Sequence, residues 1–359
     1  MILQPHGSII FNILGICLFV SNCTAFSLRD NELPNRINDN YTRKKELILP
    51  PRLKDAKSKN MLVSLELQNS MKEPIDLYIL GTVHIGSESA KDAVTLLETI
   101  RPSNVVLELP PSRYETLQKK YILQKQSKGK KKNASSNMTT SQTEMNILDA
   151  LCTIPKLAVS GWSNSGISGF LFSTFIVGSS LVKRSLTSKE EQAKLPRQNE
   201  FTAAVEAANE INATVIPADF EFEELLYKVT QSISVLGWIQ LLFQTSFGEI
   251  LRLVPVDPIR RMKGESINEW EMRRRNIETS RSSKRHGELV SPALSKVLVD
   301  DRDVRFAKKC NQILNTIPCK DDNLMTSNNM NSKNAIVCIV GLVHLDGVVS
   351  QVQLHEKKQ

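Results

Sequence analysis

The sequence predicts an α/β fold, with a mainly parallel sheet flanked by helices. The first observation is a strand–helix–strand pattern over residues 75–113, where the apolar runs "DLYILGTV" (76–83) and "NVVLEL" (104–109) enclose the helical segment "SAKDAVTLLETI" (89–100). The second is a helix followed by a strand in "EFTAAVEAANEINATVIPADF" (200–220). Strands that alternate with helices in this way pair in parallel.

The third observation lies near the C-terminal end. One long helix is expected over "SPALSKVLVDDRDVRFAKKCNQIL" (291–314), and a strand, a loop and a helix over "NAIVCIVGLVHLDGVVSQVQL" (334–354). In the predicted helix 89–100, nearer the N-terminal end, the apolar residues recur near helical spacing, and Ser87 or Ser89 is a suitable N-cap.

The composition is that of a folded globular protein. The chain has 359 residues, of which 41% are hydrophobic and 23% are charged, enough for one large domain or two ordinary ones. The formal net charge is +8, and much of the excess lies in "KGKKK" (128–132) and between Arg260 and Arg285. Such runs are usually solvated faces or loops, and no zinc-finger spacing, recognition-helix pattern or basic strand with aromatic residues accompanies them. We therefore do not expect nucleic acid as a partner.

The N-terminal end predicts a signal peptide over residues 1–25. The apolar run "SIIFNILGICLFV" (8–20) precedes "SNCTA" (21–25), which suits cleavage after Ala25. The run is shorter than the ~20 apolar residues that span a membrane. "CTAF" resembles the Ala-Phe junction of plastid presequences in algae with secondary plastids, so that residues 26–60 are interpreted as a transit peptide or a disordered linker. Plain secretory entry, to the lumen or the outside, is the alternative.

The remainder, residues 61–355, is predicted to be one domain with insertions. Residues 126–142 are polar and of low complexity, which indicates an exposed loop. Residues 157–182 carry no charge, but they are rich in serine and glycine. A buried or interfacial pair of helices is therefore favoured over a membrane span, and the same holds for residues 237–256. Any contact of this chain with a membrane is therefore expected to be peripheral.

Two histidines occur in matching local settings. His84 follows the first predicted strand and His344 follows the last, each as the end of a Gly-x-x-His motif, and Glu108 ends the second strand. Because the carboxyl ends of parallel strands line one edge of a sheet, the three side chains are expected to lie together. Imidazoles more than about 10 Å apart would exclude a shared metal ion, since ligand bonds are only ~2 Å long.

Imidazole and carboxylate groups at one edge predict a divalent metal site. The candidate ligands are His84, His344, Glu108 and Glu200. They suit zinc, manganese or cobalt, which would activate a water molecule for attack on a carbonyl. Glu108 is then a ligand or the general base, and Glu200, at the start of a helix, is a ligand or a partner of the helix dipole. Arg113 is the second catalytic candidate, binding a substrate carboxylate or bracing Glu108.

Five motifs between about Asp76 and Val352 resemble a known family. They are "GTVH…S", "RPSNVVLEL..SR", "NEF.AA..A...NATV", "DDRD" and "GLVH.DGV". In order and rough spacing they are similar to TraB-domain proteins, which include the pheromone-shutdown protein PrgY and the related Tiki proteases. The resemblance implies an α/β fold like that of EreA and ChaN, and the apolar segments 157–182 and 237–256 are then a helical insertion in the middle of this chain. It also implies a metal site built from the two Gly-x-x-His motifs.

The chain departs from the family pattern at three places. "QNE" (198–200) lacks the glycine that plant relatives have before the glutamate, and Phe220 stands after Asp219 where the family usually has arginine. The family's "ERD" triplet is "DRD", in which Asp303 and Arg302 are interpreted as a structural ion pair. Phe220 removes a positive charge and puts inferences about the substrate in question.

Two functions follow from these patterns. The first is a metal-dependent hydrolase, a peptidase being the closest type, that acts on a peptide or small-molecule substrate through the two histidines and Glu108. The second is a non-catalytic protein of the PrgY type that binds or sequesters a peptide in the same cleft.

Overall fold

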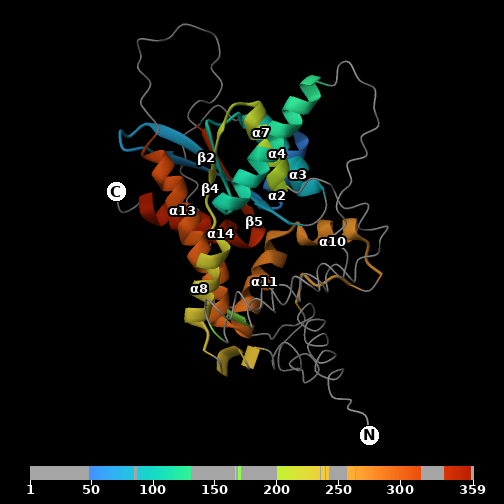
Figure 1. Cartoon of the computed structure of the whole chain (residues 1–359), viewed down its shortest axis with the longest axis vertical. Coiled ribbons are helices and arrows are strands. Elements are labelled where there is room, and N and C mark those ends of the chain that lie inside the picture. The colour runs from blue at the N-terminus through green and yellow to red at the C-terminus, as the bar shows by residue number, and fades with distance from the viewer. Residues whose placement is uncertain are drawn as a thin grey trace.

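The computed structural model describes most of residues 48–356 (Figure 1). The described residues are 48–84, 87–130, 166, 169–170, 200–234, 236–238, 240–241, 257–262, 264–316 and 335–356. The predicted signal peptide, most of residues 26–60, nearly all of 157–182 and most of 237–256 lie outside this set, so that the predictions for them stay predictions. No helix among the described residues has the length and apolar character needed to cross a lipid bilayer.

A five-stranded sheet forms the centre of the fold. Its strands are β1 (Leu62–Gln68), β2 (Pro74–Thr82), β3 (Asn104–Leu107), β4 (Thr214–Pro217) and β5 (Ala335–Gly341), in the spatial order β1-β2-β5-β3-β4. β1 is antiparallel to β2, and all other neighbours are parallel. The α/β class with a mainly parallel sheet is therefore confirmed. β5 is buried along its whole length, as expected for a central parallel strand.

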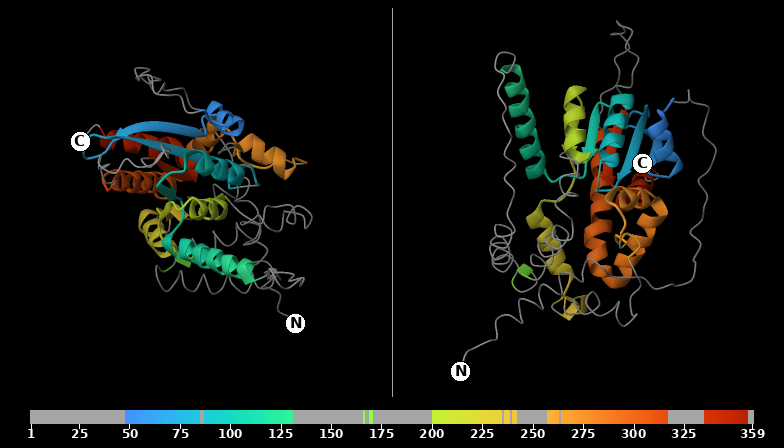
Figure 2. Two further views of the ribbon diagram at one scale, coloured as in Figure 1. Left: turned by 90° about the horizontal axis from the view of Figure 1, so that it is seen from above. Right: turned by 90° about the vertical axis from the view of Figure 1, so that its right-hand side faces the viewer.

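Helices cover both faces of the sheet (Figures 1 and 2). α3 (Glu88–Ile100) connects β2 to β3 and packs against α7 (Glu200–Glu210), which precedes β4. The chain then returns to β5 in the middle of the sheet, and α13 (Asp301–Leu314) packs against α14 (Leu345–Glu356). Right-handed crossovers in opposite directions place these two pairs on opposite faces. The edge of the sheet at which the parallel strands end lies between the two helix pairs.

The long C-terminal helix is confirmed, with a local change of pitch. It consists of α12 (Pro292–Ser295), the π-helical segment η2 (Lys296–Asp300) and α13, in direct succession. Ser291 caps its start, because the hydroxyl accepts a hydrogen bond from the backbone of Leu294. π-Helical turns inside α-helices are frequent at functional sites. Here the π segment ends two residues before Arg302.

The folded part begins earlier than residue 61. α2 (Pro51–Ser58) starts with proline at its first position and buries Leu53 and Ala56 in the main core. The next element, β1, pairs with β2 from Leu62 to Gln68. Residues 51–60 are therefore not a linker. The alternation of buried and exposed positions in β1 is the signal that distinguishes this edge strand from the buried parallel strands.

Two basic stretches are more ordered than the sequence suggested. α4 (Pro111–Lys130) continues through the first five residues of the predicted loop 126–142, where lysine and glutamine favour a helix. Between Arg260 and Arg285 the chain forms α10 (Ile267–Arg274) and most of α11 (Ile277–Val290). Arg275 is buried there against Asp92 of α3, so that this stretch is not merely a solvated face.

A second, smaller apolar cluster lies beside the main core. α8 (Phe222–Ser232) contributes Leu226 and Val229 to it, and they pack with Trp238 and with Val297 of the π segment. This cluster joins α8 to the π segment that leads into α13, the helix that carries Arg302 of the candidate site.

Candidate active site

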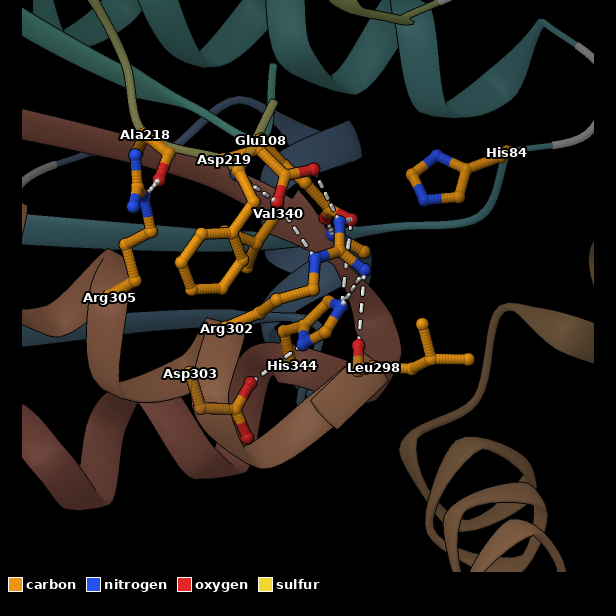
Figure 3. A network of polar contacts seen from close by, with 12 residues as sticks. His84, Glu108, Ala218, Asp219, Leu298, Arg302, Asp303, Arg305, Val340 and His344 are labelled. Atoms are coloured by element: carbon orange, nitrogen blue, oxygen red, sulfur yellow. Dashed lines mark hydrogen bonds and ion pairs between the residues drawn. The ribbon is translucent and has the colours of Figure 1, made fainter. Parts of the chain in front are cut away.

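Four polar side chains meet where the parallel strands end. His84 follows β2, Glu108 follows β3, Asp219 follows β4, and His344 lies in the 3-10 turn η4 (Leu342–His344) after β5. Figure 3 shows Arg302 of α13 between Glu108, Asp219 and His344, with His84 to one side. The carboxyl edge of a parallel sheet is the usual place for a site in α/β folds.

The two Gly-x-x-His motifs lie side by side. β2 pairs directly with β5, so that Gly81 is opposite Val340 and Thr82 is opposite Gly341. A Cβ atom on Gly341 would lie 2.9 Å from Nε2 of His84 and 3.6 Å from Cδ2 of His344. Both imidazoles therefore approach the position that a Cβ of Gly341 would occupy, so that they lie well within the limit of about 10 Å set for a shared site.

Gly341 is required by this close approach and not by its backbone angles. Its φ of −59° and ψ of 143° are accessible to any residue. However, an added Cβ would meet Nε2 of His84 at 2.9 Å and Oε2 of Glu108 at 3.2 Å, both tighter than ordinary contacts. The glycine thus leaves the space in which these two groups face each other.

His84 is held by Glu200, the first residue of α7. Nδ1 of the imidazole is hydrogen-bonded to the Glu200 carboxylate, and the ring of Phe201 lies 5.4 Å away. The His84 side chain is 49% exposed, whereas that of Glu200 is 3% exposed. Burial disfavours protonation of His84, but the bond to Glu200 and the charges of Glu108 and Glu200 outweigh it and raise the pKa of the imidazole. Nε2 remains available for chemistry.

Glu108 is buried and ionised. Burial alone would raise its pKa, but His344, Arg302 and His84, together with the bond from the backbone N–H of Gly341, lower the pKa to about 2. A general base works best when its pKa is near the working pH. Glu108 is therefore a poor proton acceptor, and the role of general base considered for it passes to His84.

Arg302 uses all of its hydrogen-bond donors within the protein. Nε and Nη2 donate hydrogen bonds to Asp219 at 2.8 and 2.7 Å, and Nη2 also donates one to Glu108. Nη1 donates to the carbonyl of Leu298 at 3.2 Å and contacts Nε2 of His344 at 3.1 Å. A guanidinium has five N–H donors, and five acceptors take them. Arg302 therefore organises the site and has no donor left for a substrate.

His344 also has both ring nitrogens occupied. Because Arg302 can only donate, Nε2 of His344 accepts, and the ring proton lies on Nδ1, which donates to Asp303 at 2.6 Å. Asp303 reaches this position because residue 347 is a glycine, where any side chain would collide with the carboxylate. His344 is therefore buried and held at both ring nitrogens.

The predicted metal ligands leave few free donor atoms. Arg302 and Asp303 occupy both nitrogens of His344, and His84 occupies Glu200. At Gly341, Nε2 of His84 lies near Oε2 of Glu108, which already accepts a hydrogen bond from the backbone N–H of Gly341. In the described part of the chain, no three His, Cys, Asp or Glu side chains form a group that could hold a metal ion. The metal site therefore stays a prediction, and we derive no chemical step through a metal ion.

Two residues of the predicted set have other positions or partners. Arg113 is exposed on α4, and the arginine that contacts Glu108 is Arg302. The predicted pair between Arg302 and Asp303 is not formed. Asp303 binds His344 and lies 3.7 Å from Lys284, while Arg302 turns toward the strand ends. Sequence reasoning also missed Asp219, although a carboxylate directly after a strand is the same signal that identified Glu108.

Phe220 has an electrostatic role of its own. The ring is nearly buried, with the guanidinium of Arg305 4.3 Å and the ammonium of Lys228 4.9 Å from its centroid. Cations are attracted to the face of an aromatic ring at such distances. Phe220 thus stands where the family pattern has an arginine, and its ring holds two other cations, Arg305 and Lys228, beside the site.

Comparisons with known proteins leave the family open. A scan against protein-family models gives no match for this chain, and neither does a search of curated proteins. The resemblance to TraB-domain proteins therefore stays a prediction from five motifs.

Gly341→Ala is expected to reduce turnover by roughly 10- to 100-fold while the fold is kept. The added methyl displaces His84 and Glu108, and misplacing a catalytic group by about 1 Å has an effect of this size. The half-exposed His84 side chain can move, so that the loss of stability should be small. Gly287→Ala is the matched control, because its Cβ would meet only Ser295 at an ordinary 3.8 Å. Full activity in Gly341→Ala would mean that the close approach is not used.

Proposed function

We propose that the chain is a hydrolase of the TraB type, in which His84 activates a water molecule for attack on an acyl carbon. The observation that carries the proposal is the half-exposed imidazole of His84. Its Nδ1 is bound by a buried carboxylate, and its Nε2 faces the ionised Glu108. A histidine oriented by a carboxylate is the common form of a general base in hydrolysis.

The proposed reaction uses water as the nucleophile. Glu200, Phe201, Glu108 and Gly341 lie around His84 in the described part of the chain, and none of these four residues carries a hydroxyl or a thiol. Nε2 of His84 takes a proton from water while the water oxygen bonds to the carbonyl carbon. His84 then returns this proton to the leaving nitrogen or oxygen as its bond to carbon breaks. Glu200 holds the proton on Nδ1 and stabilises the imidazolium that forms in between.

The remaining groups support this step by position and charge. Glu108 favours the protonated form of His84, and Arg302 and His344 keep Glu108 in place and ionised. The family resemblance supports a peptide as the substrate and the EreA- and ChaN-like version of the α/β fold.

A peptide-binding protein without turnover is the second candidate. One observation favours it: Arg302 and His344 are fully satisfied within the protein, so that a ligand would meet a rigid surface. Such a site can hold a peptide without any chemistry.

Turnover by the full chain tests the proposal. The purified chain is incubated with a panel of peptides, anilides and aryl esters, with and without a chelator, and its metal content is measured. We expect hydrolysis that survives the chelator and disappears in His84→Gln. A stoichiometric divalent ion that is lost in the His84→Ala, His344→Ala double variant would favour the metal-dependent hydrolase. Binding of a peptide without cleavage would favour the second candidate.

A further inference from the structure

Three consecutive arginines end helix α10 and continue past it, and they differ in their partners. Arg273 binds Glu265 and the carbonyls of residues 258 and 260, and Arg275 binds Asp92 at 2.6 Å. Arg274, between them, has no acceptor among the described residues; its Nε is buried without a hydrogen-bond partner, as are Nε and Nη1 of Arg275. Arg274 is half-buried, and a buried N–H donor without an acceptor is costly unless a ligand supplies one.

Helix α10 lies against the start of α3, the helix that follows His84. The carboxylate of Glu271 accepts hydrogen bonds from the backbone N–H groups of Glu88 and Ser89 at 2.9 and 3.4 Å. α10 is thereby docked on the N-terminus of α3, which begins four residues after His84. Residues three apart lie on the same face of a helix, so that Arg274 shares the face of Glu271. The positive charge of Arg274 is also felt at the His84 imidazole.

The guanidinium of Arg274 is fixed in position by its neighbour. It lies 5.5 Å from the centroid of the Trp270 ring, whose indole N–H is itself held by the carbonyl of Ile259 at 2.8 Å. Stacking of this kind orients a guanidinium and leaves its edge free for a carboxylate. Burial lowers the pKa of Arg274 to about 10, against the charge of Asp257, and it stays protonated at neutral pH.

We infer that Arg274 binds a carboxylate of the substrate, so that the substrates are peptides or N-acyl amino acids cleaved next to a free C-terminal carboxylate. This inference rests on the proposed hydrolysis at His84. Arg113, which the sequence suggested for this task, is exposed on α4.

Paired probes test the inference with the full chain. N-acetylated dipeptides are compared as free acids and as C-terminal amides, both for kcat/KM and for binding by equilibrium dialysis. A hydrogen bond to a charged group contributes about 1.5–3 kcal/mol, so that the free acid should be preferred by roughly 10- to 100-fold. Arg274→Gln should abolish this preference by raising KM for the acid alone, and Arg274→Lys should restore part of it. Arg281→Gln, which removes an exposed charge on α11, should leave the preference unchanged.

The outcomes separate this inference from the proposed function. Equal kcat/KM for acid and amide in the wild type, with turnover lost in His84→Gln, would overturn the carboxylate site and leave the hydrolase intact. If Arg113→Gln lost the preference for the free acid and Arg274→Gln kept it, the assignment to Arg274 would be wrong. If neither probe is turned over, equilibrium dialysis is the test. Tighter binding of the free acid than of the amide, lost in Arg274→Gln, supports the carboxylate site. Equal binding of acid and amide refutes it. Thermal unfolding should show that Arg274→Gln keeps its fold, so that the change in KM is not a loss of structure.

Discussion

Arg302→Met is expected to lower the free energy of unfolding by about 3–5 kcal/mol, the usual effect of removing one partner from a buried ion pair. The variant leaves the carboxylates of Glu108 and Asp219 facing each other without a cation, and Glu108 is only 7% exposed. It also removes the donor that holds Nε2 of His344. Urea unfolding followed by circular dichroism measures the change.

The effect of Arg302→Met should depend on pH in a defined direction. The pKa of Glu108 is about 2 in the folded chain, against 4.5 as its ordinary value. The stability that ionised Glu108 contributes is thus present above about pH 4.5 and is lost as the pH falls through about 2. The difference between wild type and variant should therefore shrink in acid.

A control distinguishes a buried network from an ordinary surface pair. Arg281→Met removes an exposed bridge to Asp346, which should change stability by at most about 1 kcal/mol. If Arg302→Met were as stable as Arg281→Met, the guanidinium would not be what holds the strand ends together. If Arg302→Met did not fold, Arg302→Lys, which retains the charge but loses the fork of donors, should show an intermediate stability.

The fold and the meeting of the histidines were predictable because their signals are local. Strand–helix–strand periodicity and the repeated Gly-x-x-His context need only neighbouring residues, and both strands are buried and apolar. β2 and β5 then proved to be direct neighbours in the sheet. The edge strand β1 and helix α2 were missed because an uncertain targeting segment precedes them, although Pro51 at the helix start was visible.

The partners of Arg302 were not predictable from local sequence. Glu108 is 194 positions away and Asp219 is 83 positions away. The adjacent Asp303 suggested a local pair, yet consecutive residues on a helix do not face each other, and this rule argued against the pair from the start. The low pKa of Glu108, which argues against a role as general base, was not predictable for the same reason. Its pKa depends on Arg302, His344 and the backbone of Gly341, which only the folded chain brings to it.

Glu200→Gln is expected to lower kcat by ~10²–10⁴ without unfolding the chain. The carboxylate accepts the Nδ1 proton of His84 and so leaves Nε2 free to take a proton from water. An amide at this position can donate to Nδ1 instead, which moves the ring proton to Nε2 and blocks the general base. Glu210→Gln, exposed at the far end of the same helix, is the matched control and should retain full activity.

The pH profile of kcat/KM gives the sharper result. His84 must be neutral to accept a proton, so that wild-type activity should rise with pH through a pKa above the ordinary 6.5. The groups that act on this pKa are Glu200 of α7 and Glu108 after β3, which raise it, and Arg274 of α10, which lowers it. Glu200→Gln removes the strongest raising contribution, and the acid limb should move to lower pH while the plateau falls. A lower plateau with an unmoved limb would mean that Glu200 acts only through the fold, and that the titrating base is a group other than His84.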